Sequence, residues 1–180
     1  ILSSFSYDES ALLFYFFNGL AIKFPALDFL FAFLANNFGL VVIVALGYFL
    51  LIHKEKKRGT QELVMMLAVA GLAWTVGHFL KDIFNTARPF VSLSDAIQLI
   101  PHEADGAFPS GHATFYSALA MMMWFYHKRI ALGLGLVALI VGVSRVITGV
   151  HWPVDILGGF MLGVVIAMGT YFFIKNFSGK

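Results

Sequence analysis

Long apolar runs separated by short polar connections dominate this sequence. A membrane-spanning helix needs roughly 20 apolar residues, and about 17 to 25 are tolerated. Five runs meet or approach this length, and they predict spanning helices at about residues 29–52, 62–84, 111–126, 130–147 and 153–174. The first run is interrupted near its start by Asn36 and Asn37. The pattern therefore predicts an all-α, polytopic membrane helix bundle.

Residues 1–24 form a shorter apolar and aromatic segment. An acidic pair followed by a serine is suited to begin a helix, and the run from Ala11 to Ile22 is short for a span. We interpret the segment as an interfacial helix that leads into Pro25, with a short sixth span as the alternative. Residues 1–180 are expected to form one membrane-embedded domain, with the core bundle at 29–174.

The composition agrees with a membrane location and excludes several classes of protein. Of the 180 residues, 59% are hydrophobic and only 12% are charged, and the mean hydropathy is +0.84. The absence of cysteine excludes disulfides and cysteine-ligated metals. The net charge of +2 is too small to indicate a nucleic-acid partner. Because the chain is so hydrophobic, membrane lipids are its expected surroundings.

The basic residues predict which end of the bundle faces the cytoplasm. Short cytoplasmic loops are enriched in Lys and Arg. Eight of the twelve basic residues fall in connections on one side: Lys54, Lys56, Lys57, Arg58, Lys128, Arg129, Lys175 and Lys180. The other four, Lys23, Lys81, Arg88 and Arg145, fall toward the opposite face. We expect that opposite face to be the external one.

The stretch from Ser144 to Asp155 places a cation, an imidazole and a carboxylate between two apolar runs. Pro153 suits the first turn of a helix, so His151 and Asp155, four residues apart, are expected on one helical face. A carboxylate that fixes the imidazole tautomer leaves the other ring nitrogen free to act as a base or nucleophile. The alternative is an interfacial histidine beside an ordinary helix cap.

Two further polar clusters fall on the same face. Lys81 ends the second run and is followed by Arg88-Pro89, while Pro109-Ser110-Gly111-His112 begins the third. Ser110 is suited to cap that helix, and Gly111 lets a ligand approach the backbone, so the free N–H groups there form an anion site. Taken singly, the cations fit snorkelling anchors and the serine an ordinary cap.

These separate interpretations fail when the clusters are combined. Three cations, a helix N-terminus and two histidines reach one membrane face from the ends of several spans. A charge at membrane depth costs about 2.5 to 3.5 kcal/mol on insertion scales, and the like charges also repel one another. A bound phosphate would offset both costs, and the planar fork of arginine matches phosphate oxygens. The sequence therefore predicts a phosphate site.

The three clusters together resemble a known family. Lys81 with Arg88-Pro89, Pro109-Ser110-Gly111-His112, and Ser144-Arg145 with His151 and Asp155 match, in order and spacing, the three-part signature of the type 2 phosphatidic acid phosphatase family. Every signature position is present. The motifs cover about Lys81 to Asp155, and the helical layout extends the similarity over most of the chain.

The resemblance implies hydrolysis of a phosphate ester or diphosphate through a phosphohistidine. His151 would attack, Asp155 would orient it, and His112 would protonate the leaving oxygen and then activate water. The phosphate-binding groups would be Lys81, Arg88, Ser110, Gly111 and Arg145, with Ser144 and Pro89 in support. These roles imply a bell-shaped pH profile. No metal or other cofactor is expected, since no carboxylate cluster lies near the signature.

The loop of about twenty residues between the second and third spans holds further candidates. His102, Glu103 and Asp105 lie in this loop, and Asp82 lies beside Lys81. A loop of this length is often functional, so these side chains could tune contacts to the leaving group or head group. A solvated loop is the default interpretation.

The implied substrate is a lipid phosphate whose tail stays in the bilayer. The short loops and the stretch from His102 to Asp105 are similar to bacterial undecaprenyl diphosphate phosphatases of this family, which implies a bacterial inner membrane with the site outside. Phosphatidylglycerophosphate, phosphatidic acid and lipid A phosphate are alternatives. A vanadium haloperoxidase would share the anion pocket but is soluble. A lipid-phosphate binder or transporter would need only the cations.

Overall fold

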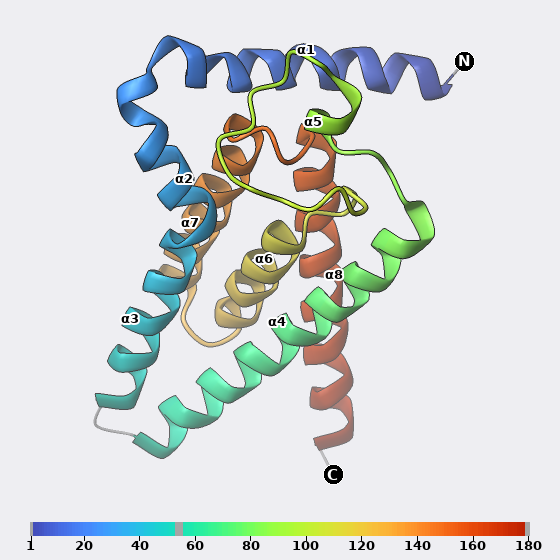
Figure 1. Cartoon of the computed structure of the whole chain (residues 1–180). Coiled ribbons are helices and arrows are strands. Elements are labelled where there is room, and N and C mark those ends of the chain that lie inside the picture. The colour runs from blue at the N-terminus through green and yellow to red at the C-terminus, as the bar shows by residue number, and fades with distance from the viewer. Residues whose placement is uncertain (1, 53–55, 179–180) are drawn as a thin grey trace.

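The computed structural model describes residues 2–52 and 56–178, and this part of the chain is helical without β-strands (Figure 1). The helices are α1 (Leu2–Lys23), α2 (Asp28–Asn36), α3 (Phe38–Ile52), α4 (Lys56–Phe84), α5 (Pro89–Ser92), α6 (Gly111–Trp124), α7 (Lys128–Ile147) and α8 (Pro153–Ser178), with a short 3₁₀ turn at Pro25–Leu27. The predicted all-α membrane bundle is confirmed.

Helix α6 is the centre of the bundle. It packs against α4, α7 and α8, and α2 packs on the outer side of α7 (Figure 1). Its buried side chains include Leu119, Met122 and Met123, which meet Met66 and Ala70 of α4 in the main hydrophobic core. Because its neighbours shield it, α6 can be short and still cross the apolar interior of the molecule.

Three helical segments of the described chain are long and apolar enough to span a membrane alone. They cover Lys57–Ser92, Lys128–Ile147 and Pro153–Phe177. Helix α6, with 14 residues, falls short of the usual length. The run predicted at 29–52 is divided at Asn37 into α2 and α3, which is the interruption that the two asparagines indicated. The chain is an integral membrane protein, as its composition indicated.

Helix α1 lies across the end of the bundle where α5 and the start of α8 also lie (Figure 1). The chain bends by 87° between residues 10–21 and 25–36. Asn18 holds α1 in place, because its amide donates to the backbone oxygens of Ile97 and Ile147 at 2.8 and 2.9 Å. The choice between an interfacial helix and a short span for residues 1–24 stays a prediction.

The signature residues meet because each lies where a helix begins or ends. Asn85 ends α4 in the left-handed region (φ 41°), with its N–H donating to Lys81 O. After α7, Gly149 has φ 80°, and a side chain there would collide with the backbone oxygen of Ile97. As predicted, the Ser110 side chain caps α6, and Pro153 is the first residue of α8.

Helix α8 approaches α6 closely through two glycines. A Cβ atom at Gly159 would lie 2.7 Å from Ser110 O, and one at Gly163 would collide with Ser117. The small residues therefore let the two backbones pack closely. This contact brings the beginning of α8, with His151 and Asp155, against the beginning of α6.

The described basic residues outside the signature lie mostly at the far end of the bundle, where α4 and α7 begin and α8 ends (Figure 1). These are Lys57, Arg58, Lys128, Arg129 and Lys175. Lys54 and Lys180 lie outside the described residues, and so does the side chain of Lys56. The separation matches the predicted charge asymmetry, and the direction in which the protein crosses its membrane stays a prediction.

Candidate active site

His151 and Asp155 form a buried pair at the junction of α7 and α8. His151 is 1% exposed, and its Nδ1 lies 3.2 Å from Asp155 Oδ2. The same carboxylate oxygen accepts the backbone N–H of Trp152 at 2.8 Å. The contact predicted from the four-residue spacing is therefore present, and the first turn of α8 holds the carboxylate in place.

The neighbours of His151 fix which ring nitrogen carries the proton. Arg88 Nη1, which can only donate, lies 3.4 Å from His151 Nε2. Nε2 is therefore unprotonated, and Nδ1–H donates to Asp155. Burial, followed by the positive charges of Arg145 and Arg88, holds the pKa of His151 well below its ordinary value of 6.5. The imidazole is neutral at physiological pH, as a nucleophile must be.

Arg145, near the end of α7, is the buried cation with the most free hydrogen-bonding capacity. It is 2% exposed, and its Nη1 donates to Asn36 Oδ1 at 3.0 Å. Its Nε and Nη2 atoms have no hydrogen-bond partner among the described residues. An unpaired buried guanidinium edge is costly in the free protein, so it indicates a site for an anion.

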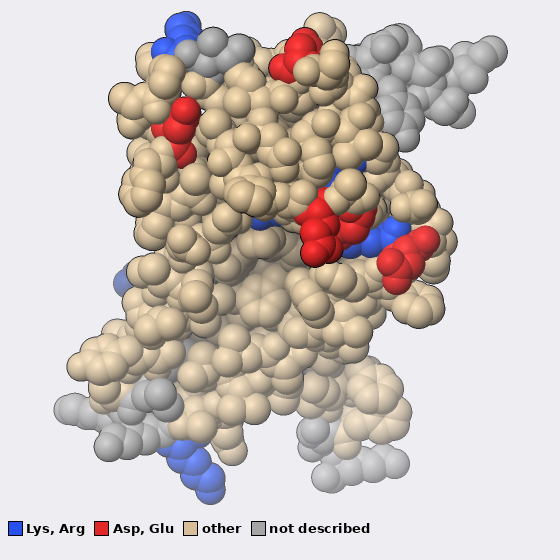
Figure 2. Space-filling view, in the orientation of Figure 1, with Lys and Arg blue, Asp and Glu red and all other residues tan. Residues whose placement is uncertain are grey.

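Lys81 and Arg88 are held by the outer loop. Lys81 is 6% exposed and donates to Gly106 O at 2.9 Å. Arg88 is fully buried and pairs with Asp105 at 2.8 Å. Figure 2 shows acidic and basic side chains side by side at the level of this loop, on a surface that otherwise carries few charges.

The beginning of α6 forms another part of the site. Ser110 N–H donates to Asp155 O at 3.0 Å, which ties α6 to α8. Gly111 and His112 line a cavity of about 300 Å³, together with Trp74 and Tyr116 among others. A Cβ atom at Gly111 would meet the indole of Trp74 at 3.3 Å, so the backbone is closely approached there by protein groups. His112 therefore lies in the first turn of α6, beside an apolar cavity.

The remaining predicted residues are placed as follows. Ser144 is buried, and its backbone oxygen accepts the Thr148 hydroxyl at 2.9 Å. Pro89 begins α5 directly after Arg88. His102 lies over His151, with ring centroids 6.3 Å apart, whereas Asp82 is exposed. Burial, followed by the charge of Arg88, lowers the pKa of His102.

Two residues that hold parts of the site in place were not predicted from the sequence. Asn36 holds Arg145, and Asn18 fixes α1 over the site. A polar residue inside an apolar run was the available signal in both cases. The described residues contain no group of three or more His, Asp or Glu side chains placed to hold a metal.

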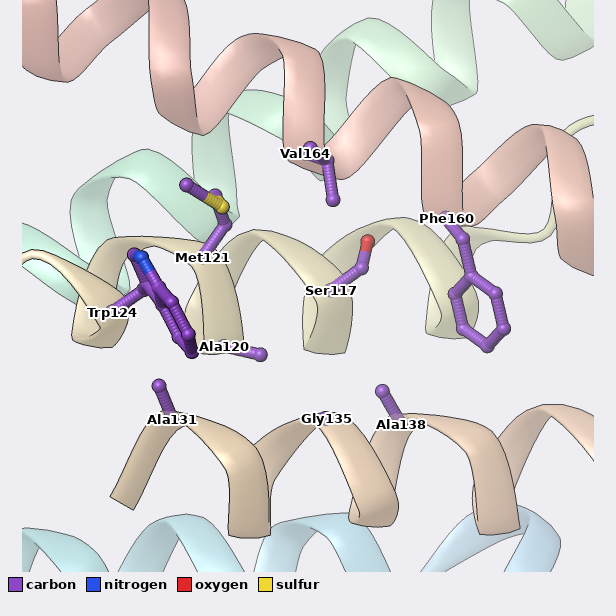
Figure 3. A pocket seen from close by; sticks show the side chains of 9 residues that line it. All are labelled: Ser117, Ala120, Met121, Trp124, Ala131, Gly135, Ala138, Phe160 and Val164. Atoms are coloured by element: carbon purple, nitrogen blue, oxygen red, sulfur yellow. The ribbon is translucent and has the colours of Figure 1, made fainter. Parts of the chain in front are cut away.

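A second cavity, of about 250 Å³, lies away from the polar cluster between α6, α7 and α8 (Figure 3). Small residues of α7, such as Ala131 and Gly135, form one wall, and Trp124 of α6 lies opposite them (Figure 3). No signature residue lines this cavity. It is an apolar space that is separate from the polar cluster.

Comparison with known proteins identifies the family. Residues 61–178 match the sequence model of the PAP2 superfamily. The bacitracin transport permease protein BcrC of Bacillus licheniformis is 29% identical over 88% of this chain and 77% of its own length. The undecaprenyl-diphosphatase BcrC of Bacillus subtilis is 36% identical over 61% of this chain, which spans only 56% of that protein.

A solved structure agrees with this assignment. The PAP2-type phosphatidylglycerolphosphate phosphatase of Bacillus subtilis superposes with a TM-score of 0.64 and 26% identity, over 98% of this chain and 87% of that one. The similarity covers the helices that carry the polar cluster. The chain therefore belongs to the PAP2 superfamily and is an integral-membrane lipid phosphatase.

Proposed function

We propose that this protein hydrolyses undecaprenyl diphosphate to undecaprenyl phosphate through a phosphohistidine at His151. The observation that carries the proposal is the combination of an unprotonated Nε2 on His151 with the unpaired nitrogens of Arg145 in one buried cluster. The first supplies a nucleophile, and the second supplies donors for phosphoryl oxygens. The identity to an undecaprenyl-diphosphatase supports this substrate.

The reaction would proceed in two balanced steps. Nε2 of His151 attacks the terminal phosphorus, the bond to the bridging oxygen breaks, and His112 gives that oxygen a proton. Water then gives a proton to His112 and attacks phosphorus, the P–N bond breaks, and inorganic phosphate leaves. Asp155 stabilises the imidazolium character that develops on His151. Lys81, Arg88 and Arg145 would neutralise the phosphoryl oxygens, with Ser110 and Gly111 at the helix end.

The cavity beside His112 supports a lipid as the leaving group. In-line displacement places the leaving oxygen opposite the nucleophile, where His112 would protonate it. The adjoining space is lined by apolar groups of α4 and α6, including Trp74 and Phe115. A lipid tail would enter there from the bilayer, with the phosphate at the end of the bundle that we expect to face outward across a bacterial inner membrane.

The substrate assignment is tested by phosphate release in detergent with EDTA present. We expect wild-type protein to release phosphate from undecaprenyl diphosphate at least tenfold faster, by kcat/KM, than from phosphatidylglycerophosphate. The reverse ratio would instead favour phosphatidylglycerophosphate, as the similar solved phosphatase indicates. Loss of activity in EDTA would contradict the metal-independent mechanism.

A transport role is the second candidate, because one relative is named a transport permease. Binding and transport of a lipid phosphate need the cations but not the His151–Asp155 pair. We therefore expect His151→Ala to abolish phosphate release. A wild-type protein that binds these lipids but releases no phosphate from any lipid phosphate would favour transport.

A further inference from the structure

The outer loop places the carboxylate of Asp105 on one edge of the Arg88 guanidinium. Oδ1 of Asp105 accepts from Arg88 Nη2 at 2.8 Å and from Nε at 3.0 Å, and the backbone oxygen of Asp105 accepts from Nε at 3.2 Å. The loop also lies tightly on α4, since a Cβ atom at Gly106 would be 2.7 Å from Lys81 O. Asp105 lies outside the three-part signature.

The opposite edge of Arg88 faces the nucleophile. Nη1 donates to Val150 O at 2.7 Å and lies 3.4 Å from His151 Nε2. A guanidinium is rigid and planar, so the contacts that fix Nε and Nη2 also fix the direction of Nη1. Arg88 is fully buried, which leaves it little freedom to turn. The Asp105 carboxylate, together with the backbone oxygens of Asp105 and Gly106, thus binds the edge of Arg88 that lies away from His151 Nε2.

The charge of Asp105 persists under physiological conditions. Partial burial raises the pKa of this carboxyl, but hydrogen bonds and the charge of Arg88 outweigh that effect and hold it below its ordinary value. Asp105 Oδ2 also lies 3.8 Å from Lys81 Nζ. The carboxylate therefore stays ionised at neutral pH and interacts with two of the three signature cations.

We propose that Asp105 is a positioning residue for phosphoryl transfer: it holds Arg88 so that Nη1 meets the transferring phosphoryl group at His151. The inference rests on the proposed phosphatase site. The competing explanation is that the Asp105 carboxylate occupies the place of the substrate phosphate on Arg88, and that the substrate must displace it. The geometry opposes it, because Asp105 occupies the far edge of Arg88 and leaves Arg145 unpaired.

The test compares Asp105→Ala with the matched control Glu103→Ala, which removes an exposed loop carboxylate two residues away. Alanine is chosen because asparagine would keep an Oδ1 acceptor for Nε and Nη2 of Arg88. Removing a transition-state donor typically costs about 10²- to 10³-fold in kcat, and a misdirected donor costs less. We expect kcat of Asp105→Ala to fall about 10- to 100-fold with KM within threefold. Glu103→Ala should stay within twofold of wild type in both constants.

Two outcomes would overturn the proposal. One is an unchanged kcat in Asp105→Ala protein whose thermal unfolding in detergent matches wild type. The other is a lower KM with kcat retained, the result expected if substrate displaces the Asp105 carboxylate from Arg88. If Asp105→Ala does not fold, Asp105→Glu decides. Its longer side chain keeps the charge but moves Arg88, and a displacement near 1 Å can cost about 10²-fold. An unchanged kcat there would also refute positioning.

An activity-independent measurement separates this inference from the proposed substrate. Orthovanadate mimics the transferring phosphoryl group, and its binding is followed by the rise in melting temperature. We expect the half-saturating vanadate concentration to increase at least tenfold in Asp105→Ala. Equal or tighter vanadate binding would overturn the positioning role, whereas failure of wild type to hydrolyse either lipid would overturn only the substrate assignment.

Discussion

Replacing Arg145 by methionine is expected to make the protein more stable and inactive. The side chain is buried, and two of its three nitrogens have no partner among the described residues. Each buried, unsatisfied donor costs about 1–3 kcal/mol. Arg145→Met removes both costs and leaves one acceptor, Asn36 Oδ1, unpaired at a similar cost per group. The net gain is about 1–3 kcal/mol, or roughly 2–12 °C in melting temperature for a chain of this size.

The loss of activity follows from the same two nitrogens. A hydrogen bond to a charged group contributes about 1.5–3 kcal/mol, so two bonds from Arg145 to the phosphoryl oxygens contribute about 3–6 kcal/mol. Their removal lowers kcat/KM by about 10²- to 10⁴-fold. Phosphate release and thermal unfolding would be measured on the same detergent-solubilised preparation, with and without orthovanadate.

Arg88→Met provides the matched control, because it also removes a buried arginine. All three Arg88 nitrogens are bonded, to Asp105, Gly106 and Val150. Allowing for solvent access to Asp105, we expect Arg88→Met to destabilise the protein by about 2–4 kcal/mol. Two inactive variants with opposite changes in melting temperature are thus predicted. An Arg145→Met protein that is less stable than wild type, or retains kcat/KM within tenfold, would refute the assignment of Arg145 to the phosphate.

Three further predictions concern the nucleophile and the lipid tail. Asp155→Asn keeps an oxygen for the Trp152 and His151 N–H groups but loses the charge. This loss should cost about 1–2 kcal/mol, or roughly 5- to 30-fold in kcat, and Asp155→Ala should lower kcat far more. Equal losses of kcat in the two variants would contradict this geometry. Because the pKa of His151 is lowered, its imidazole stays neutral as the pH falls, so kcat/KM should decline only below pH 6.5. The ionisation of the substrate itself would be measured separately by ³¹P NMR. A decline of kcat/KM above pH 6.5 that the substrate's ionisation does not explain would contradict this prediction. Gly71→Leu fills the cavity beside His112 and should raise KM for a long-chain lipid at least fivefold, with no rise in KM for a short water-soluble phosphate ester. Gly135→Leu fills the cavity of Figure 3 and should leave KM for the long-chain lipid unchanged. The reverse pattern would place the lipid tail between α6, α7 and α8.

Much of the polar cluster was predictable because its residues lie at helix ends. Spacing of four residues across a proline-led turn was enough to predict the His151–Asp155 contact. Ser110 followed the ordinary preference for serine at a helix N-cap. Such local rules depend on a few neighbouring residues, so a single sequence carries them.

The parts that the sequence did not predict depend on contacts between distant segments. Asn36 reaches Arg145 across 109 positions, and only the packing of α2 on α7 brings them together. Asp105 was one of several acidic residues in a loop whose default interpretation was a solvated loop. Its ion pair with Arg88 depends on how the loop folds back over α4. Loop conformation is set by tertiary packing rather than by periodicity, so composition offered no way to rank these acids.

The most direct test of the phosphohistidine mechanism is a single-turnover reaction with a lipid substrate carrying ³²P at its terminal phosphate, quenched in alkali to preserve a P–N bond. The mechanism predicts that label appears on His151 within the first turnover, decays as inorganic phosphate forms, and is absent in His151→Ala. Substrate turnover by wild type with no label on His151 at any time, or turnover that survives in His151→Ala, would contradict it.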